Sequence, residues 1–252
     1  IPFNISTGPA LPAKVNPTPC NVRTVSFMRF SLLPALTYAL LRAIRNAAIA
    51  IFVLAAPILA EPVSILALGD SLTAGLGLPP EQGFVPQLQN WLAAQGQDVT
   101  VINGGVSGDT TAGGLSRLDW SLTPDVKALI VNLGGNDLLR GLPPAEARAN
   151  LEAILADAKA KGLPVLLVKL TAPGNFGADY KNAFDAIYPD LAAKYGAILS
   201  DHYFQPLADP ATGLMMAGVM QEDGIHPNAK GVTLAVAALG PKVEQLLAQI
   251  RP

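Results

Sequence analysis

The chain has 252 residues, of which 50% are hydrophobic and 14% charged, and its formal net charge at pH 7 is −2. This apolar content excludes an intrinsically disordered protein, and the sequence pI near 5.7 argues against a nucleic-acid-binding protein. Cys20 is the single cysteine, so an intrachain disulfide and a cysteine-based zinc site are both excluded.

The basic and acidic residues are unevenly distributed along the chain. Residues 1–60 contain five basic and no acidic residues, whereas residues 61–252 contain twelve basic and nineteen acidic ones. A basic, acid-free segment before an acidic body is typical of a targeting segment. We therefore expect residues 1–60 to be a leader and residues 61–252 to form a single domain.

Within the leader, the composition changes at Met28, the first methionine. Residues 1–27 contain five scattered prolines and are expected to be unstructured; one interpretation places them upstream of the true start. The apolar run 47–60 has 14 residues, which suits the core of a signal peptide and is shorter than the roughly 20 residues of a spanning helix. Two alternatives follow: cleavage near Ala60 with export to the periplasm or beyond, or an uncleaved N-terminal anchor.

The body alternates short apolar runs with segments of helical periodicity. Five apolar runs have the composition of strands buried on both faces, and they are Val63–Leu68, Val99–Ile102, Val126–Leu133, Pro164–Leu170 and Ala197–Ser200. Helices are expected at Phe84–Gln95, Pro143–Gly162, Ala183–Tyr195 and Val232–Ile250. Gly240-Pro241 should break or kink the last helix. This alternation predicts an α/β fold, a three-layer α/β/α sandwich with a five-stranded parallel sheet in flavodoxin-like order.

In such a sheet the active site lies beyond the carboxyl ends of the strands, so the residues directly after each strand are the candidates. Ser71 follows the first strand at a strand-to-helix turn, where a serine hydroxyl can act as a nucleophile close to backbone N–H groups. Thr73 occupies the place of the last glycine in G-x-S-x-G, so the turn is not that nucleophile elbow. The alternative is that Asp70 or Ser71 simply caps the helix.

The next two strands are also followed by polar segments. Residues 103–110 (NGGVSGDT) form a glycine-rich turn whose backbone N–H groups can bind an anion, either a phosphate or a tetrahedral oxyanion. The turn has neither the lysine nor the spacing of a P-loop, which excludes that nucleotide site. Asn136, after the third strand, can donate a side-chain N–H into the same space. Both segments have a simpler interpretation as tight turns.

Two histidines are candidates for a catalytic base. Asp223 precedes His226 by three residues, about one turn away if the segment is helical. A histidine is the usual base for a serine hydroxyl, and a nearby carboxylate fixes its tautomer. His202 begins an irregular stretch and has no carboxylate at such a spacing, so we expect it to pack or to face solvent.

Four segments together resemble the sequence blocks of the GDSL, or SGNH, hydrolases. In chain order they are Gly69-Asp70-Ser71-Leu72, Ser107-Gly108-Asp109-Thr110, Gly134-Gly135-Asn136-Asp137 and Asp223-Gly224-Ile225-His226-Pro227. The resemblance spans residues 63–247, essentially the whole body. The strings GGNDLLRG at 134–141 and NAFDAIYPDL at 182–191 are similar to the bacterial periplasmic branch of thioesterases, lysophospholipases and arylesterases.

This resemblance implies a serine hydrolase that needs no metal or organic cofactor. Ser71 would be the nucleophile, His226 the general base and Asp223 the residue that orients His226. The backbone N–H groups of Ser71 and Gly108 and the side chain of Asn136 would form the oxyanion hole. We expect an exported monomer that cleaves small carboxylic esters or thioesters through an acyl-enzyme, with no nucleic-acid partner and no stable membrane span in the mature chain.

One loop, Thr171–Gly177 (TAPGNFG), departs from the pattern of this branch in its spacing and at Phe176. The resemblance implies that the loop shapes the acyl pocket, with Pro173, Asn175 and Phe176 binding the substrate. Two alternatives to acyl-ester hydrolysis are removal of acetyl groups from carbohydrate, as in other branches of the family, and a catalytically silent lipid- or glycan-binding module on the same fold.

Overall fold

The computed structural model describes residues 37–38, 40–46 and 63–250. The chain divides into two units, Ile1–Leu59 and Ala60–Pro252, and each is described by itself. In the first unit, residues 37–38 and 40–46 are helical. The predicted signal-peptide core at 47–60 and its cleavage site lie outside the described residues. Among the helices that the structure describes, none is long and apolar enough to cross a membrane.

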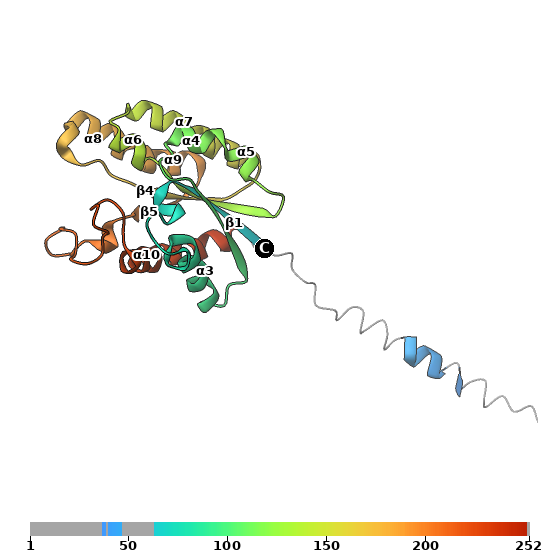
Figure 1. Ribbon diagram of the computed structural model, residues 1–252. Helices are drawn as coiled ribbons and strands as arrows, with labels where there is room; N and C mark the ends of the chain where they lie inside the picture. The colour runs from blue at the N-terminus through green and yellow to red at the C-terminus, as the bar shows by residue number, and fades with distance from the viewer. Residues whose placement is uncertain (1–36, 39, 47–62, 251–252) are drawn as a thin grey trace, which may run out of the picture. The chain divides into compact units, whose positions relative to one another are not determined.

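A five-stranded parallel sheet forms the centre of the second unit (Figure 1). Its strands are β1 (Val63–Gly69), β2 (Val99–Gly105), β3 (Val126–Asn132), β4 (Val165–Lys169) and β5 (Ile198–His202). They lie in the order β2-β1-β3-β4-β5, and every neighbouring pair is parallel. Strands β1 and β3 are buried at almost every residue because helices cover both faces of the sheet. The predicted fold and strand order are confirmed.

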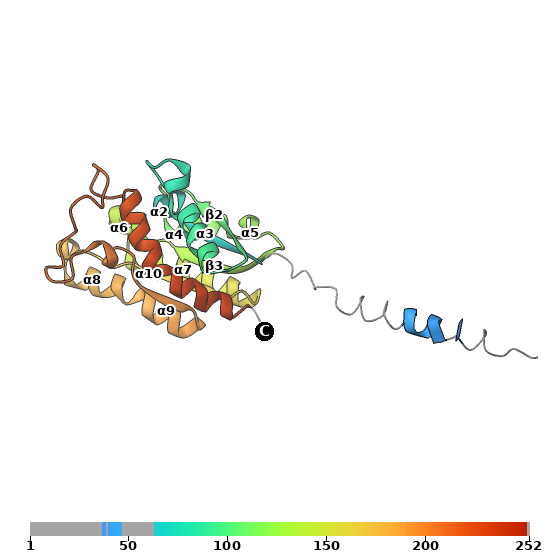
Figure 2. The same cartoon turned by 90° about the horizontal axis from the view of Figure 1, so that it is seen from below.

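Helices form a layer on each side of this sheet (Figures 1 and 2). One layer consists of α3 (Phe84–Ala94) and α10 (Ala229–Ala248), which pack against each other. The other layer contains α4 (Thr111–Ser116), α5 (Leu118–Ser121), α7 (Pro144–Ala160), α8 (Ala178–Asp185) and α9 (Ile187–Tyr195). Two short helices follow strands directly, and they are α2 (Ser71–Ala74) and α6 (Gly135–Leu139). Three 3₁₀ turns complete the described elements, η1 (Pro80–Gln82), η2 (Gly174–Phe176) and η3 (Gln205–Leu207).

The segment predicted as one helix over 183–195 is two helices. Helix α8 ends at Asp185 and α9 begins at Ile187. Pro189 lies within the first turn of α9 and has no N–H to donate to the carbonyl of Asp185, so the hydrogen-bond ladder of a continuous helix is interrupted there. The prediction of a single helix was therefore wrong.

The predicted break at Gly240-Pro241 is also absent, since α10 runs without interruption from Ala229 to Ala248. The carbonyl that Pro241 leaves without a donor belongs to Ala237, which lies on the exposed side of the helix where water can replace that donor. Gly240 serves the packing of α10 on α3. A Cβ at Gly240 would lie 2.6 Å from ring atoms of Trp91, so only a glycine lets the two helices approach this closely.

Strand β2 is longer than predicted, because Asn103–Gly105 continue the strand alongside β1 and are not part of the turn. A Cβ at Gly104 would lie 3.0 Å from the carbonyl oxygen of Ala67, and one at Gly105 would lie 2.2 Å from the backbone nitrogen of Ala74. The two glycines therefore bring β2 against both β1 and α2. This close approach places the turn after β2 next to the turn after β1.

Candidate active site

Ser71 is the first residue of α2 and follows β1 after a single residue, Asp70. The side chain of Asp70 caps this short helix, because its Oδ1 accepts a hydrogen bond of 3.0 Å from the backbone N–H of Leu72. Ser71 is 9% exposed. The serine hydroxyl is thus held at the carboxyl edge of the sheet.

The hydroxyl of Ser71 lies within hydrogen-bond distance of His226, although 155 residues separate them in sequence. The Ser71 Oγ to His226 Nε2 distance is 2.8 Å, and the His226 Nδ1 to Asp223 Oδ2 distance is 2.6 Å. The structure thus brings together the three residues that the sequence pattern singled out. The arrangement permits proton transfer from the serine hydroxyl to an imidazole whose other nitrogen faces a carboxylate.

Asp223 is held in place by the backbone of the same turn. Its Oδ1 accepts hydrogen bonds from the backbone N–H groups of Ile225 (2.9 Å) and His226 (3.0 Å). The segment is therefore an aspartate-centred turn and not the helical turn considered in the sequence analysis. The backbone and ring hydrogen bonds from His226 lower the pKa of Asp223 to about 2, so this carboxyl is ionised at neutral pH.

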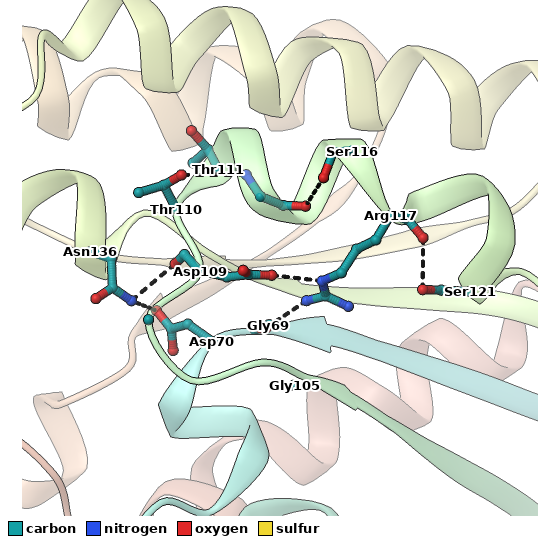
Figure 3. A network of polar contacts seen from close by, with 12 residues as sticks. Gly69, Asp70, Gly105, Asp109, Thr110, Thr111, Ser116, Arg117, Ser121 and Asn136 are labelled. Atoms are coloured by element: carbon teal, nitrogen blue, oxygen red, sulfur yellow. Dashed lines mark hydrogen bonds and ion pairs between the residues drawn. The ribbon is translucent and has the colours of Figure 1, made fainter.

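Asn136 lies in α6, the short helix that follows β3. Its Nδ2 donates to the carbonyl oxygen of Asp109 at 2.9 Å and lies 3.4 Å from Oδ2 of Asp70 (Figure 3). Gly108 has a φ of +87°, which favours glycine, and its carbonyl accepts a hydrogen bond of 2.7 Å from Nη2 of Arg140. Polar groups from the turns after β1, β2 and β3 therefore meet at one point.

A largely buried ion pair joins the first two of these turns (Figure 3). Arg117 Nε lies 2.6 Å from Oδ2 of Asp109, and Arg117 Nη2 donates to the carbonyl of Gly69 at 2.8 Å. The side chains of Arg117 and Asp109 are only 8% and 18% exposed. Arg117 therefore connects the turn that carries Gly108 to the last residue of the strand that precedes Asp70 and Ser71.

Asp137 connects α6 to α4 through hydrogen bonds. Its carboxylate is 1% exposed and accepts hydrogen bonds from the backbone N–H (2.8 Å) and the hydroxyl (2.6 Å) of Thr111. Asn150 of α7 donates to the same hydroxyl at 3.1 Å. These contacts fix the start of α4 to the helix that carries Asn136.

Ser71, Gly108, Asn136 and His226 line one cavity of about 520 Å³. Most of its other lining residues are apolar, and they are Leu72, Leu76, Leu138, Leu139, Leu170, Phe204, Met215, Met220 and Ile225. Leu139 is 61% exposed, so its side chain lies at the mouth of the cavity. The site thus combines a few polar groups with an apolar surface, as ligand pockets for apolar molecules do.

Comparison with known proteins agrees with this geometry. Residues 67–234 match the GDSL-like lipase/acylhydrolase family. The chain belongs to that family. It is 39% identical over 185 residues to the esterase TesA of Pseudomonas aeruginosa, covering 73% of this chain and 89% of the relative. It is 37% identical over 168 residues to thioesterase 1/protease 1/lysophospholipase L1 of Escherichia coli K12, covering 66% of this chain and 76% of the relative.

Solved structures show the same relationship. A crystal structure of TesA is 37% identical with a TM-score of 0.66, and the match covers 73% of this chain and 99% of that one. The SGNH-hydrolase family esterase AlinE4 is 44% identical with a TM-score of 0.61, and the match covers 75% of this chain and 98% of that one. The family membership implied by the four sequence blocks is confirmed.

Pro173, Asn175 and Phe176, which the sequence analysis assigned to the acyl pocket of this GDSL-family hydrolase, are not among the described residues that line the cavity. They belong to the segment around η2, where Phe176 packs on Tyr180 with 4.9 Å between ring centroids. From the same loop, Thr171 does line the cavity. Phe176 therefore contacts α8, and the assignment of these three residues to the acyl pocket stays a prediction.

His202 also differs from the sequence-based expectation. It is the last residue of β5 and not the start of an irregular stretch, and it lines the same cavity as Ser71. It is no competitor of His226, because the Ser71 hydroxyl makes its hydrogen-bond contact with His226. In the part of the chain that the structure describes, no group of three or more histidine, cysteine, aspartate or glutamate side chains could hold a metal ion.

The apolar lining of the cavity is what the sequence analysis missed. The pair Leu138-Leu139 directly follows Asn136-Asp137 in a short helix, and two consecutive leucines beside a predicted oxyanion donor were the available signal. Met215, Met220 and Ile225 lie in the irregular segment before α10, where no periodicity marks which side chains face a cavity.

Proposed function

We propose that this protein hydrolyses carboxylic esters or thioesters, with Ser71 as nucleophile, His226 as general base and Asp223 as the group that orients His226. The observation that carries the proposal is the continuous set of contacts from Asp223 through His226 to Ser71, at 2.6 and 2.8 Å, inside an apolar cavity. The relatives named esterase TesA, arylesterase and thioesterase 1/lysophospholipase L1 support the same class of reaction.

The first half-reaction acylates Ser71. His226 Nε2 accepts the hydroxyl proton as Oγ attacks the carbonyl carbon, and Asp223 Oδ2 accepts the Nδ1–H and stabilises the imidazolium. His226 then gives the proton to the leaving alcohol or thiol, and an acyl-serine remains. In the second half-reaction His226 deprotonates a water molecule, which attacks the acyl-serine and releases the carboxylic acid and free Ser71.

The oxyanion would be held by the backbone N–H groups of Ser71 and Gly108 and by Nδ2 of Asn136. Asn136 Nδ2 makes a 2.9 Å hydrogen bond to Asp109 and a longer, 3.4 Å contact with Asp70. The second amide hydrogen makes only the longer contact with Asp70, and a substrate oxygen would have to replace that contact. The hydrogen bond to Asp109 keeps the amide in the required orientation meanwhile.

The apolar lining favours acyl groups with a hydrocarbon chain over acetylated carbohydrate, because a sugar needs polar partners that leucine and methionine side chains do not provide. A catalytically silent binding module is also disfavoured, because such a module does not need a serine, a histidine and an aspartate in hydrogen-bond contact.

The test uses purified residues 61–252. We expect hydrolysis of p-nitrophenyl acyl esters, weak or no activity on acetylated sugars, and covalent labelling of Ser71 by a fluorophosphonate. Ser71→Ala and His226→Ala should each reduce turnover to a similar floor, because residues that act as one unit are not additive. A chain that is folded but neither hydrolyses any ester nor takes the label would refute the proposal.

We further propose that residues 1–60 are a leader and that residues 61–252 act as a monomer in the periplasm or outside the cell. The absence of acidic residues before Glu61 and the unit boundary after Leu59 support this division. Residues 61–252 alone should be soluble, active and monomeric in analytical ultracentrifugation. An insoluble or inactive fragment beside an active full chain would contradict it.

A further inference from the structure

The cavity extends along the carboxyl edge of the sheet away from Ser71. Its lining includes a residue at the end of each successive strand: Ser71 after β1, Asn136 after β3, Leu170 after β4 and His202 at the end of β5. Neighbouring strands lie about 4.8 Å apart, so the three intervals from β1 to β5 span roughly 14 Å. Ser71 therefore lies towards one end of the cavity and His202 towards the other.

The acyl chain and the leaving group of a substrate must occupy different parts of this cavity. His226 protonates the leaving group, so that group lies beside the turn 223–227, where Asp223 and Ile225 are exposed. The acyl chain therefore occupies the other part of the cavity, which leads away from this turn past Leu170 towards His202. We call this part the arm, and Leu170 in it is 4% exposed. An apolar chain gains most by entering that buried arm. His202 lies at its far end.

The ring of His202 suits an apolar chain end. Burial lowers the pKa of His202, Lys169 and Lys181 act in the same direction, and Asp185 opposes them, so the ring is neutral at pH 7. The ring centroid lies 5.8 Å from that of Phe204, another lining residue. Within the described residues, the ring makes no hydrogen bond or ion pair. Its position thus depends on packing and on β5.

A second cavity of about 640 Å³ lies next to His202. Its lining includes Tyr203, Met216 and Ala238, and among the described residues His202 is the one that lines both cavities. Neighbours in sequence line different cavities, with Phe204 and Met215 on the first, and Tyr203 and Met216 on the second. The segment 203–216 therefore separates the two cavities, and His202 lies where both reach the same side chain.

We propose that the His202 side chain closes the acyl end of the Ser71 cavity and sets the upper limit of acyl-chain length. The inference rests on the proposed ester hydrolysis. A smaller side chain at position 202 would join the two cavities and admit longer acyl chains. A larger apolar side chain would shorten the arm and favour shorter ones.

The test measures the ratio of kcat/KM for p-nitrophenyl palmitate to that for p-nitrophenyl octanoate. His202→Ala should raise this ratio about tenfold or more, and His202→Phe should lower it, because each methylene that gains or loses its apolar site changes kcat/KM by about tenfold or more. Gln205→Ala, which alters the second cavity alone, is the matched control and should leave the ratio as in the wild type.

A second variant tests the route of the longer chain. Ala238→Trp fills the second cavity from α10. In the His202→Ala background it should return the ratio towards the wild-type value, whereas in the wild-type background it should have no effect.

The outcomes separate this inference from the proposed function. A wild-type chain without esterase activity or fluorophosphonate labelling refutes the function. An active wild type whose ratio is unchanged in His202→Ala and His202→Phe, both labelled at Ser71, overturns the role of His202. If His202→Ala takes no label because it does not fold, the direction of the His202→Phe shift decides.

Discussion

Asp70 Oδ2 lies 3.4 Å from the amide nitrogen of Asn136, which also donates to the carbonyl oxygen of Asp109 at 2.9 Å (Figure 3). Asp70 is 2% exposed, and burial raises its pKa to about 6, while the backbone N–H of Leu72 and the nearby His226 act in the opposite direction. At neutral pH the protein therefore keeps an ionised carboxylate in a buried site, where it can accept a hydrogen bond from Asn136.

This carboxylate should reduce stability at neutral pH. The folded state binds a proton at Asp70 more tightly than the unfolded chain does, so the free energy of unfolding falls as the pH rises from about 4 to about 6. An asparagine has no such cost and can still cap α2 through its side-chain oxygen. Asp70→Asn should therefore be more stable at pH 8, by up to about 3 kcal/mol for a shift of roughly two pKa units.

Denaturant unfolding of wild type and Asp70→Asn at pH 4 and pH 8 checks this. The gain should be much smaller at pH 4, where Asp70 is protonated in the folded state and about half protonated in the unfolded chain. A variant that is less stable than the wild type at pH 8 would show that the hydrogen bond to Asn136 outweighs burial. We expect kcat of Asp70→Asn to fall, because an amide at position 70 holds the Asn136 amide less firmly.

Asn136 should act in the transition state and not in substrate binding, because negative charge develops on the carbonyl oxygen only during attack. Asn136→Ala should lower kcat by roughly 10²–10³-fold with little change in KM. Loss of the hydrogen bond to Asp109 should cost about 1 kcal/mol of stability. Asn136→Asp should be at least as harmful, since a carboxylate repels the oxyanion. Steady-state kinetics on folded protein decides, and near-wild-type kcat in Asn136→Ala would remove this residue from the oxyanion hole.

The pair of Arg117 and Asp109 should contribute more to the stability of the fold than a surface ion pair of the same length. Arg117→Ala leaves Asp109, whose side chain is 18% exposed, without its partner and should destabilise the fold by up to about 3–5 kcal/mol. The matched control is Arg148→Ala, which breaks a pair with Asp190 of the same 2.6 Å length at the surface. That change should cost less than about 1 kcal/mol. Equal losses in the two variants, measured by denaturant unfolding, would show that Arg117 has no special role.

The sheet could be predicted from sequence because its strands are apolar runs that a helix-covered parallel sheet requires. Their ends could not. Residues 103–105 have the composition of a turn, and they are a strand because Gly104 and Gly105 fit against Ala67 and Ala74. No local pattern contains that information, since it depends on contacts with residues more than 30 positions earlier.

The site also has one part that could be predicted from the sequence and one part that could not. Ser71, Asp223 and His226 lie in short blocks whose chemistry and order are visible in the sequence. The cavity is not visible, because its lining comes from separate segments, and an exposed leucine such as Leu139 cannot be told from the apolar residues found on any protein surface. Phe176 packs on Tyr180, a contact that no local pattern in the loop indicates, and its assignment to the acyl pocket stays a prediction.

Gly240 offers a test of helix packing, because an alanine at this position should destabilise the protein, although an alanine normally stabilises a helix relative to glycine. Replacing a glycine inside a helix by alanine normally stabilises it by about 1 kcal/mol. Here a Cβ would lie 2.6 Å from the ring of Trp91, so Gly240→Ala should destabilise the protein by roughly 1–3 kcal/mol. In a Trp91→Leu background the obstacle is gone, and the same change should become neutral or stabilising. A double-mutant cycle of unfolding free energies measures this coupling. Equal effects of Gly240→Ala in both backgrounds would mean that the helices α3 and α10 shift apart at little cost.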